Sequence, residues 1–434
     1  MRKRRILLIS GEAWRDESNG GNVLSNLFGS FVDEYEFAQI YTNPALPANS
    51  ICTNYFHLSE ADMLKSVLKR KSFGRVLQKN EINQKESEKG AHTNNRFSYI
   101  RKHLLNTAFL IQDLLWRFSK WKTPELEKFI LDFNPDIIFA PMYYGVHLHR
   151  LDRYVARLTG KNLVSYVSDD HLTFKQFSLS PFFWFNRLVL RSNVFATSKY
   201  YSLLFTMTQE QLEEYQPVLK VPMKVLKKTG DFLIQPIYLR KQATPLVISY
   251  GGNLIYNRYK TLAKLAEAIK KINKEKIHVV LNIYTQTPVT EKLKVLLHDG
   301  KNTFLKGKVT MAVLEKEYNN SDIVLHVESF DLKQRLLTRL SFSTKIIDLL
   351  HSGRCIMAIC WKESSPYKYL KLEDAAICIE DISCIEDQLN QLIQNQELIK
   401  EYAEKAWFCG KRNHDKSKNI SSFRNDFYLH SKMI

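Results

Sequence analysis

The chain has 434 residues, of which 44% are hydrophobic and 25% are charged. This balance is typical of a globular protein and excludes a disordered chain, and the length suffices for two domains of ordinary size. The net charge of +18 predicts acidic partners such as nucleotides, phospholipid head groups or nucleic acid.

The six cysteines are scattered, without a Cys-x-x-Cys pair or the Cys/His spacing of a zinc site. This pattern predicts free thiols in a reducing compartment. The basic and apolar start over residues 1–10 imitates a secretion signal, but its apolar run is too short for one. No run approaches the roughly 20 apolar residues that span a bilayer. We therefore expect a cytoplasmic protein, peripheral at the inner face of the cell membrane.

The first predicted strand covers residues 5–10, where an apolar run follows basic residues. The loop after it ends in Gly20 and Gly21, and apolar residues then recur at helical spacing from Val23 to Phe31. A glycine pair before a helix permits a ligand to approach the backbone closely, although it also suits a plain turn. It is not the Gly-x-Gly-x-x-Gly dinucleotide fingerprint.

A basic, helical insertion is predicted over about residues 60–122, because residues 65–122 hold fourteen Lys or Arg and four acidic residues. Residues 101–121 have helical spacing, with Leu104, Ala108, Ile111, Leu115 and Phe118 on one face. Trp116 and Trp121 stand near its end beside the basic residues Arg117, Lys120 and Lys122. Such a helix suits an anionic membrane surface, and it equally suits a core helix with a basic rim.

The chemistry candidate of the first domain follows a strand predicted over residues 162–167. Asp169, Asp170 and His171 stand at its carboxyl end, where they could take a proton from a hydroxyl or bind a cation. A third ligand group for a metal is not evident, and a polar loop with capping aspartates is the alternative. An aromatic helix beginning at Pro181 and a short strand over residues 193–196 are predicted next.

The alternation of strands and helices continues after a linker, which predicts two doubly wound α/β domains. We place the first domain at residues 1–236, the second at 245–410 and a tail at 411–434. The second domain begins with a strand, then Gly251 and Gly252, and then a helix that opens near Arg258.

Residues 321–360 predict strand, loop, helix and strand. Glu328 leaves the first of these strands at its carboxyl end, which faces the ligand crevice of an open α/β sheet. Ser343, Thr344 and Lys345 precede the helical run that contains Asp348. Ser and Thr can cap that helix, and a helix N-terminus beside a lysine is a good seat for a phosphate.

The run Ser343–Gly353 resembles the nucleotide-binding helix of GT-B glycosyltransferases, in particular family 4-like enzymes of capsule, lipopolysaccharide and other surface polysaccharide synthesis. Their usual run is Ser-x-Lys-x-x-Glu-Tyr, followed by two small residues and Gly. This chain departs from it by an insertion over residues 331–340 and by the shorter acid Asp348. The resemblance implies a GT-B fold, in which two Rossmann-like domains face each other across a cleft and the tail crosses back to the first domain.

The resemblance also assigns roles to residues of this sequence. It implies that Asp348 grips the ribose of a sugar nucleotide, that Glu328 faces the donor sugar, and that Arg258 and Lys345 stabilise the diphosphate. Asn253 stands where the family commonly has Arg, which leaves Arg258 and Lys260 to carry the charge. The remaining donor-side residues implied are Gly20, Gly21, Gly252, Gly307, Ser343 and Thr344.

The sequence thus predicts an enzyme that moves a sugar from a UDP- or GDP-sugar to a hydroxyl of a glycan, lipid-linked at an anionic membrane surface. Asp169, Asp170, His171 and Glu328 are its catalytic candidates, and it is expected to need no metal or other cofactor. A sugar-nucleotide epimerase of the same fold is one alternative. A basic nucleic-acid-binding protein is the other, but it rests on charge alone, and we expect no nucleic-acid partner.

Overall fold

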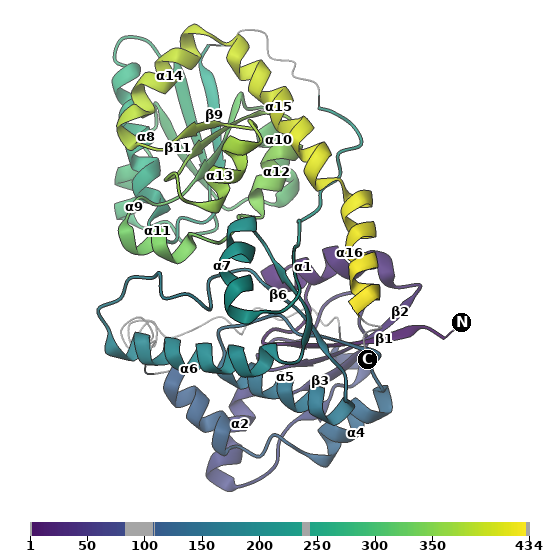
Figure 1. Cartoon of the computed structure of the whole chain (residues 1–434). Helices are drawn as coiled ribbons and strands as arrows, with labels where there is room; N and C mark the ends of the chain where they lie inside the picture. Colours follow the sequence, from purple (N-terminus) through teal and green to yellow (C-terminus); the bar gives the residue numbers. More distant parts are fainter. Residues whose placement is uncertain (1, 83–106, 108, 237–243, 431–434) are drawn as a thin grey trace. The chain divides into compact units, whose positions relative to one another are not determined.

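The computed structural model describes residues 2–82, 107, 109–236 and 244–430 (Figure 1). The chain divides into two compact units, one formed by Met1–Leu226 with Ile420–Ile434 and the other by Lys227–Asn419. Each unit contains one mainly parallel sheet flanked by helices, so the predicted α/β class with two doubly wound domains is confirmed.

The sheet of the first unit has eight strands in the order β4-β3-β2-β1-β5-β6-β7-β8. All neighbours run parallel except the edge strand β4, which pairs antiparallel with β3. The chain moves outward from β1 to β3 and later returns to β5 on the other side of β1. The strands are β1 (Arg4–Ser10), β2 (Tyr35–Tyr41), β3 (Asn54–His57), β4 (Arg75–Val76), β5 (Ile137–Phe139), β6 (Leu163–Val167), β7 (Tyr201–Thr206) and β8 (Met223–Val225).

Helices connect these strands, with two short 3-10 turns, η1 (Gly29–Phe31) and η2 (Lys79–Glu81). A further helical stretch covers residues 109–118. The helices are α1 (Asn19–Phe28), α2 (Glu60–Lys69), α4 (Pro124–Phe133), α5 (Val146–Thr159), α6 (Pro181–Ser198), α7 (Gln209–Leu219) and, at the end of the chain, α16 (Lys416–His430).

Two predictions for the first unit are wrong. Residues 193–196 form the end of α6 rather than a strand, because the helix that begins at Pro181 continues through them to Ser198. In the stretch 109–118, Ile111 and Phe118 are 57% and 70% exposed, whereas Trp116 is 3% exposed. The buried face is therefore centred on Trp116, and not on the predicted row of apolar residues. Leu104 and Ala108 of that row lie outside the described residues.

The sheet of the second unit has six parallel strands in the order β11-β10-β9-β12-β13-β14. Its strands are β9 (Leu246–Gly251), β10 (Val279–Tyr284), β11 (Thr303–Gly307), β12 (Ile323–Val327), β13 (Cys355–Ile359) and β14 (Ile377–Ile379). Its helices are α8 (Arg258–Ile272), α9 (Glu291–Leu297), α10 (Met311–Asn319), α11 (Leu332–Thr338), α12 (Lys345–His351), α13 (Ser365–Leu372), α14 (Ile385–Gln394) and α15 (Glu397–His414), with the 3-10 turn η4 (Ile382–Cys384).

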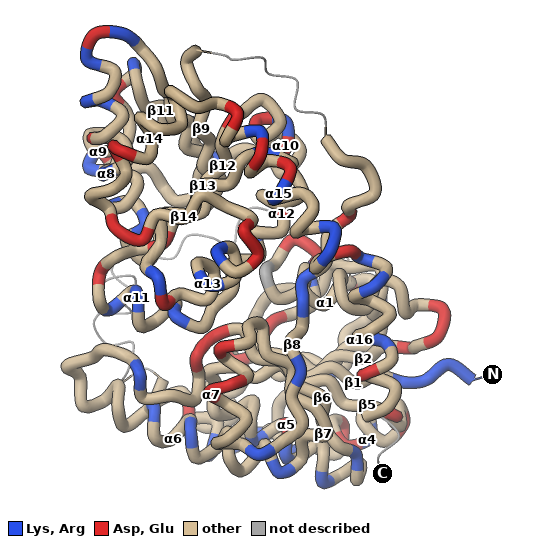
Figure 2. Tube along the Cα trace, turned by 45° about the horizontal axis from the view of Figure 1, so that its top comes forward, with Lys and Arg blue, Asp and Glu red and all other residues tan. Residues whose placement is uncertain are grey.

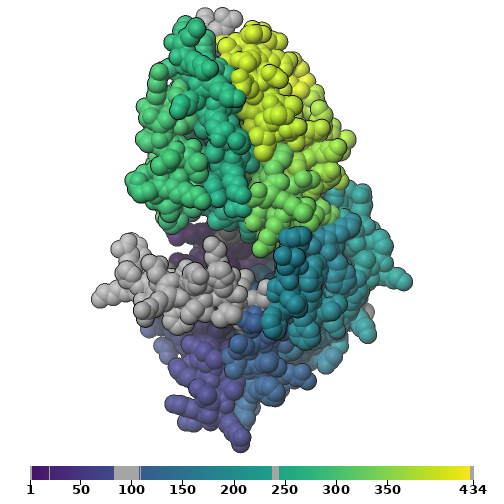
Figure 3. Space-filling model, turned by 90° about the vertical axis from the view of Figure 1, so that its left-hand side faces the viewer, coloured from purple at the N-terminus to yellow at the C-terminus, as the bar shows by residue number. Residues whose placement is uncertain are grey.

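Both faces of the second sheet are buried, as the continuous apolar run of its central strand requires. Val324 of β12 belongs to a core with α12 and α15, and its neighbour Leu325 belongs to the opposite core with α8 and α14. The side chains of a strand alternate between its two faces, so one short strand supplies both cores. Figure 3 shows α14, in yellow, against the green surface of the segment that contains α8.

The last helix, α16, begins in the second unit, and its residues from Ile420 onward belong to the first. Phe423 and Phe427 are 4% and 1% exposed, and their rings lie 5.8 and 5.7 Å from the ring of Phe28 in α1. Phe31 stacks on Phe423 at 5.9 Å. The C-terminal segment is therefore part of the hydrophobic core of the first unit.

Lys and Arg are scattered over both units, with Asp and Glu among them (Figure 2). The described residues thus do not gather the positive charge into one stripe, which the nucleic-acid alternative requires. Among the described residues, no helix is both long and apolar enough to cross a membrane.

The aromatic cluster of α16 generates a stability prediction. Phe427→Ala should lower the free energy of unfolding of the first unit by about 3–5 kcal/mol, because it removes a fully buried aromatic ring and leaves a cavity. Leu429→Ala, at a position that is 56% exposed on the same helix, should change it by less than about 0.5 kcal/mol. Urea unfolding followed by circular dichroism measures both, and equal effects would contradict the docking of α16.

Candidate functional site

The carboxyl edge of the second sheet is where this fold accommodates a ligand. The chain runs outward from β9 to β10 and β11, then returns to β12 on the other side of β9. At such a reversal the connecting segments leave on opposite faces, and a crevice opens at the carboxyl ends of the two strands. Gly252 follows β9 and Glu328 follows β12, so both stand at this reversal.

Arg258 and Glu328 form a bidentate ion pair at this edge. Nε of Arg258 donates to Oε2 of Glu328 at 3.1 Å, and its NH2 group donates to Oε1 at 2.7 Å. The two side chains are 16% and 5% exposed. Burial alone would lower the pKa of Arg258, but Glu328 outweighs it and the pKa lies above its ordinary value. The pair fixes a charged guanidinium at the start of α8.

Lys345 supplies a second cation at the same place. Its Nζ lies 5.9 Å from the centre of the Tyr250 ring and so close to Gly252 that a Cβ added there would be 2.1 Å from it. Burial and the nearby Arg258 together lower the pKa of Lys345 to about 8, against the opposing carboxylates Glu328 and Asp348. Gly252 thus leaves room for the Lys345 ammonium, which a larger residue would displace.

Asp348 lies one turn into α12, and its pKa is raised by partial burial, which the Lys228 ammonium opposes. Nζ of Lys228 lies 3.7 Å from the Asp348 carboxylate and donates to the Thr344 carbonyl at 3.2 Å. Lys228 is a neighbour that the sequence analysis missed, because it lies 120 positions earlier in the chain.

The predicted caps of α12 are not formed within the described residues. Thr344 occupies the N-cap position without a side-chain capping bond, because its own φ and ψ of −59° and −21° are already helical. Capping needs an extended residue whose hydroxyl reaches forward. Ser343 precedes it, and its carbonyl accepts a bond from the Ile346 amide at 3.0 Å.

The other residues predicted to bind the donor in the second unit lie farther from the ion pair or already have partners within the protein. Lys260 is half-exposed, and its Nζ donates to Asp331 at 2.7 Å, so a neighbouring acid already engages it. The Asn253 carbonyl accepts from the Tyr250 hydroxyl at 2.9 Å, which holds the turn after β9. Gly307, with φ of 77°, ends the edge strand β11, two strands away from Gly252.

In the first unit, Asp170 is a structural residue rather than a free base. Its Oδ1 pairs with NH2 of Arg187 at 3.0 Å, and the two side chains are 1% and 0% exposed. The Thr173 amide and the Tyr215 hydroxyl also donate to Oδ1, at 2.9 and 3.2 Å. Burial raises the pKa of Asp170, but Arg187 and these local bonds outweigh it and bring the pKa below its ordinary value. The carboxylate is thus surrounded by donors, which is a poor arrangement for accepting a substrate proton.

Asp169 and His171 stand on either side of Asp170 in the sequence, and both remain catalytic candidates. Asp169 is exposed, and its carbonyl accepts from Gln211 at 3.1 Å. Burial lowers the pKa of His171, so its imidazole is neutral near pH 7. Its Nδ1 is buried and has no hydrogen-bond partner among the residues that the structure describes.

The glycine pair Gly20 and Gly21 lies inside the first turn of α1 and not in the loop before it. A Cβ on Gly21 would meet the carbonyl oxygen of Arg15 at 1.9 Å. Gly21 therefore allows the preceding loop to pack on the helix, which is a structural reason for the glycine.

Some site residues could not be found from the sequence. From the sequence, Tyr250 is one more apolar residue of a buried strand, whereas in the structure the Lys345 ammonium lies over its ring. His326 is 4% exposed inside β12 with Nε2 3.9 Å from Glu328, and burial lowers its pKa to about 3. Within the described residues, no group of three or more His, Cys, Asp or Glu side chains could hold a metal ion.

No protein-family model and no curated protein matches the sequence. Solved structures do match. Sucrose-phosphate synthase from Thermosynechococcus elongatus is 12% identical, with a TM-score of 0.64, over 98% of this chain and 99% of that one. HepE from Anabaena, in complex with UDP and glucose, is 12% identical with a TM-score of 0.60, over 98% of this chain and all of that one.

The chain has the GT-B fold. A glycosyltransferase from Rickettsia africae also matches, at 11% identity and a TM-score of 0.59 over the full length of both chains. The predicted GT-B fold is therefore confirmed. At such identities the likeness shows the fold alone, and the activity of the chain has to be argued from its own residues.

The contrast between two adjacent aspartates can be tested. Asp170→Ala should lower the free energy of unfolding by about 3–5 kcal/mol, because it leaves the Arg187 guanidinium buried without its counter-charge. Asp169→Ala, at an exposed position, should change it by less than about 0.5 kcal/mol. Chemical unfolding followed by tryptophan fluorescence compares the two variants. A stable Asp170→Ala protein would return Asp170 to the catalytic candidates.

Proposed function

We propose that the chain is a glycosyltransferase that moves a sugar from a nucleotide diphosphate sugar to a hydroxyl of a glycan acceptor. The observation that carries this proposal is the pair of cations at the reversal of the second sheet. Arg258 lies near enough to help lower the pKa of Lys345, against the carboxylates Glu328 and Asp348, and Glu328 forms its ion pair with Arg258. A bound diphosphate would relieve that repulsion.

The chemistry of the transfer fits this arrangement. When the bond between the sugar and the diphosphate breaks, negative charge develops on the leaving phosphate oxygen. A guanidinium that is already held in place by Glu328 stabilises that charge without reorganising. Lys345 adds an ammonium whose proton is held less tightly than usual, because its pKa is lowered to about 8.

The remaining donor contacts are proposals of the same kind. Asp348, on α12, would accept hydrogen bonds from ribose hydroxyls, and Lys228 would hold its carboxylate. Glu328 would act chiefly by positioning Arg258, because both of its oxygens accept from that guanidinium. The solved complexes of HepE contain UDP and UDP-glucose, which favours a uridine nucleotide over GDP as the first donor to test.

We further propose that the acceptor is lipid-linked and that the first unit binds the anionic inner surface of the cell membrane, in surface polysaccharide synthesis of the capsule or lipopolysaccharide type. Trp116 and Trp121 are both buried, so they cannot anchor this unit in a membrane, which was one of the two interpretations of their helix. The support comes instead from α6 and the loop before it, where six apolar side chains are 44–88% exposed: Phe174, Phe177, Leu179, Phe182, Phe185 and Leu188. Exposed apolar surface of this kind marks a binding surface.

Donor binding supplies the test of the proposed function. At pH 8 about half of the Lys345 side chains are neutral in the free protein, and a bound diphosphate should raise their pKa. UDP binding should therefore take up protons at pH 8 and hardly any at pH 6.5. Isothermal titration calorimetry in buffers of different ionisation enthalpy counts these protons. Lys345→Met should abolish the uptake and weaken UDP roughly tenfold or more, as expected for the loss of a charge-assisted hydrogen bond.

Lys264→Met is the matched control, because Lys264 lies exposed on α8 and pairs with Glu267. Proton uptake by Lys345→Met equal to that of the wild type, or no uptake by the wild type, would contradict the donor site.

The lowered pKa of Lys345 also determines how the stability of the protein depends on pH. Between about pH 8 and the ordinary lysine pKa of about 10.4 the unfolded chain binds more protons, so the contribution of Lys345 to stability rises with pH. Lys345→Met should therefore raise Tm at pH 7, and by less near pH 10.

The same protein with UDP-hexoses distinguishes transfer from epimerisation. A transferase consumes the donor productively only when a sugar acceptor is present, whereas an epimerase interconverts the donor alone. Product analysis by nuclear magnetic resonance, with and without an acceptor glycoside, separates these outcomes.

Membrane association has its own prediction. The chain should sediment with vesicles that contain anionic lipid, and the double variant Phe182→Ser with Phe185→Ser should bind roughly tenfold more weakly or worse, because two apolar rings no longer enter the interface. Leu332→Ser, an exposed apolar position of the second unit, is the control and should bind as the wild type does. Identical sedimentation of all three proteins would exclude α6 as the contact.

A further inference from the structure

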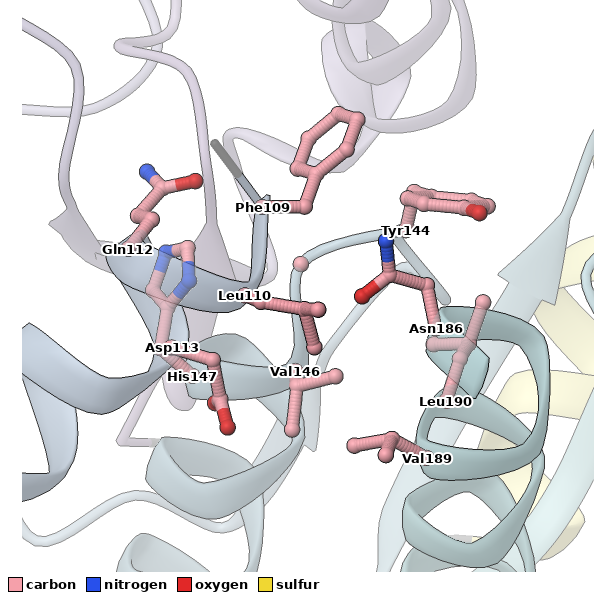
Figure 4. A pocket seen from close by; sticks show the side chains of 11 residues that line it. Phe109, Leu110, Gln112, Asp113, Tyr144, Val146, His147, Asn186, Val189 and Leu190 are labelled. Carbon is pink, nitrogen blue, oxygen red and sulfur yellow. The ribbon is translucent and has the colours of Figure 1, made fainter. Parts of the chain in front are cut away.

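A small pocket in the first unit lies at the start of α5, between the helical residues 109–118 and the middle of α6 (Figure 4). Its enclosed part has about 20 Å³ open to the centre of a water-sized sphere. One water needs about 10–15 Å³ by this measure, so the pocket is too small for a sugar ring. The contacts behind Asp348 in the second unit bear more directly on the proposed donor site.

The segment 228–232, which precedes the second sheet, packs against α12 and α15, and these two helices lie side by side (Figure 1). A Cβ added to Gly230 would lie 2.9 Å from Cγ2 of Ile347 in α12. Phe232 is 1% exposed, and its ring lies so close to α15 that a Cβ added to Gly410 would be 2.1 Å from it. The segment is therefore enclosed between the two helices.

His414, at the end of α15, binds this segment at two points. Its carbonyl accepts from the Gly230 amide at 2.9 Å, and its Nδ1 lies 2.8 Å from the Lys228 carbonyl oxygen. Burial lowers the pKa of His414 to about 4, so near pH 7 the ring is neutral and carries one hydrogen. A carbonyl can only accept, so that hydrogen is on Nδ1. Nε2 therefore accepts from the Tyr369 hydroxyl, 2.7 Å away.

Tyr369 is held in turn by its own neighbours. Its hydroxyl lies 3.3 Å from Sγ of Cys409, and burial raises the pKa of that thiol, so the thiol is protonated and can donate. The ring of Phe342 lies 5.3 Å from that of Tyr369 and 6.3 Å from that of His414, which is 3% exposed. A buried chain of hydrogen bonds thus runs in one direction, from the thiol through the hydroxyl and the imidazole to the carbonyl of Lys228.

The side chain of Lys228 continues from this fixed backbone to the proposed donor site. Its Nζ donates to the Thr344 carbonyl at 3.2 Å and lies 3.7 Å from Oδ1 of Asp348. The Lys228 side chain is 18% exposed and that of Asp348 is 39% exposed, so a ligand can reach the carboxylate while the lysine is largely enclosed. Burial raises the pKa of Asp348, and the Lys228 ammonium opposes that rise. The lysine therefore favours the ionised carboxylate, which only accepts hydrogen bonds.

We propose that His414 is a positioning residue for ribose recognition: its Nδ1–H fixes the backbone of Lys228, whose ammonium fixes the Asp348 carboxylate that accepts from the ribose hydroxyls. The proposal rests on the proposed donor site and adds to it a residue that touches no substrate. Without the bond from His414, the lysine would shift and the carboxylate would be free to turn. The ribose hydroxyls would then lose an oriented acceptor, whereas the proposed diphosphate contacts of Arg258 and Lys345 would remain.

Ribose recognition can be measured separately from the other donor contacts. UDP and 2′,3′-dideoxyuridine diphosphate share the base and the diphosphate and differ only in the ribose hydroxyls. Isothermal titration calorimetry at pH 7 gives the dissociation constants of both. The wild type should bind UDP roughly ten- to a hundredfold more tightly, as expected for hydrogen bonds to a charged acceptor. His414→Gln, which has no donor at the place of Nδ1, should reduce this preference to roughly threefold or less and leave the affinity for the dideoxy analogue unchanged.

His414→Asn is the matched variant, because the amide nitrogen of asparagine stands where Nδ1 stood, and it should retain the preference. Lys228→Met should lose the preference as His414→Gln does, and it supplies the same test if His414→Gln does not fold. Arg412→Met changes an exposed side chain of the same helix and should behave as the wild type does. Tm measured on each variant verifies that it is folded.

The possible outcomes distinguish this role from the proposed function. An undiminished preference in His414→Gln or Lys228→Met would overturn the positioning role, and so would an equal loss of affinity for both nucleotides, which indicates general damage to the second unit. A loss in His414→Asn as large as that in His414→Gln would also overturn it. A wild type that binds both nucleotides equally would overturn the ribose contact of Asp348 together with the positioning role. Failure of the wild type to bind UDP at all would instead overturn the proposed function.

Discussion

The ion pair between Arg258 and Glu328 is the constraint on which the candidate donor site depends. Two parallel strands end side by side at the reversal of the second sheet, and each contributes one partner through the segment that follows it. The bidentate geometry leaves the guanidinium no freedom to turn away, at 2.7 and 3.1 Å from the two carboxylate oxygens. The Lys345 ammonium lies next to Gly252 and near enough to this cation for its own pKa to be lowered. The strain between like charges is thereby built into the free protein and is available for an anionic ligand.

The first unit contains a similar pair with a different consequence. Asp170 and Arg187 also stand near the carboxyl edge of a parallel sheet, but they are 1% and 0% exposed. Further donors from Thr173 and Tyr215 complete the coordination of that carboxylate. In the second unit, by contrast, Arg258 is 16% exposed, and a second cation stands beside it. The first pair is enclosed by the protein, whereas the second is the one that we propose as part of a donor site.

Much of the second unit could be predicted from the sequence, because its strands are short β-branched runs and its polar residues follow them directly. The strand that ends before Glu328 and the helix of Asp348 were both predicted, and local periodicity is sufficient for such elements. What local patterns cannot give is pairing across long separations. Lys228 beside Asp348 and Arg187 beside Asp170 depend on tertiary contacts. The buried ion pair of Asp170 could not be predicted for that reason, since its partner Arg187 lies 17 positions later in the chain.

The two units differ in the charge they present to a substrate, and this difference has a chemical consequence. A nucleotide diphosphate sugar is an anion, and the candidate site of the second unit has three cations, Arg258, Lys345 and Lys228, and two carboxylates, Glu328 and Asp348. At the carboxyl edge of the first sheet, the Arg187 guanidinium is buried and paired with Asp170, and the neighbouring Asp169 is exposed. A donor that entered the first unit would lose its charge contacts, and a neutral acceptor would gain nothing from the cations of the second. In the proposed transfer, electrostatics would separate the two substrates before shape does, because removing an anion from water without a counter-charge costs far more than a poor fit.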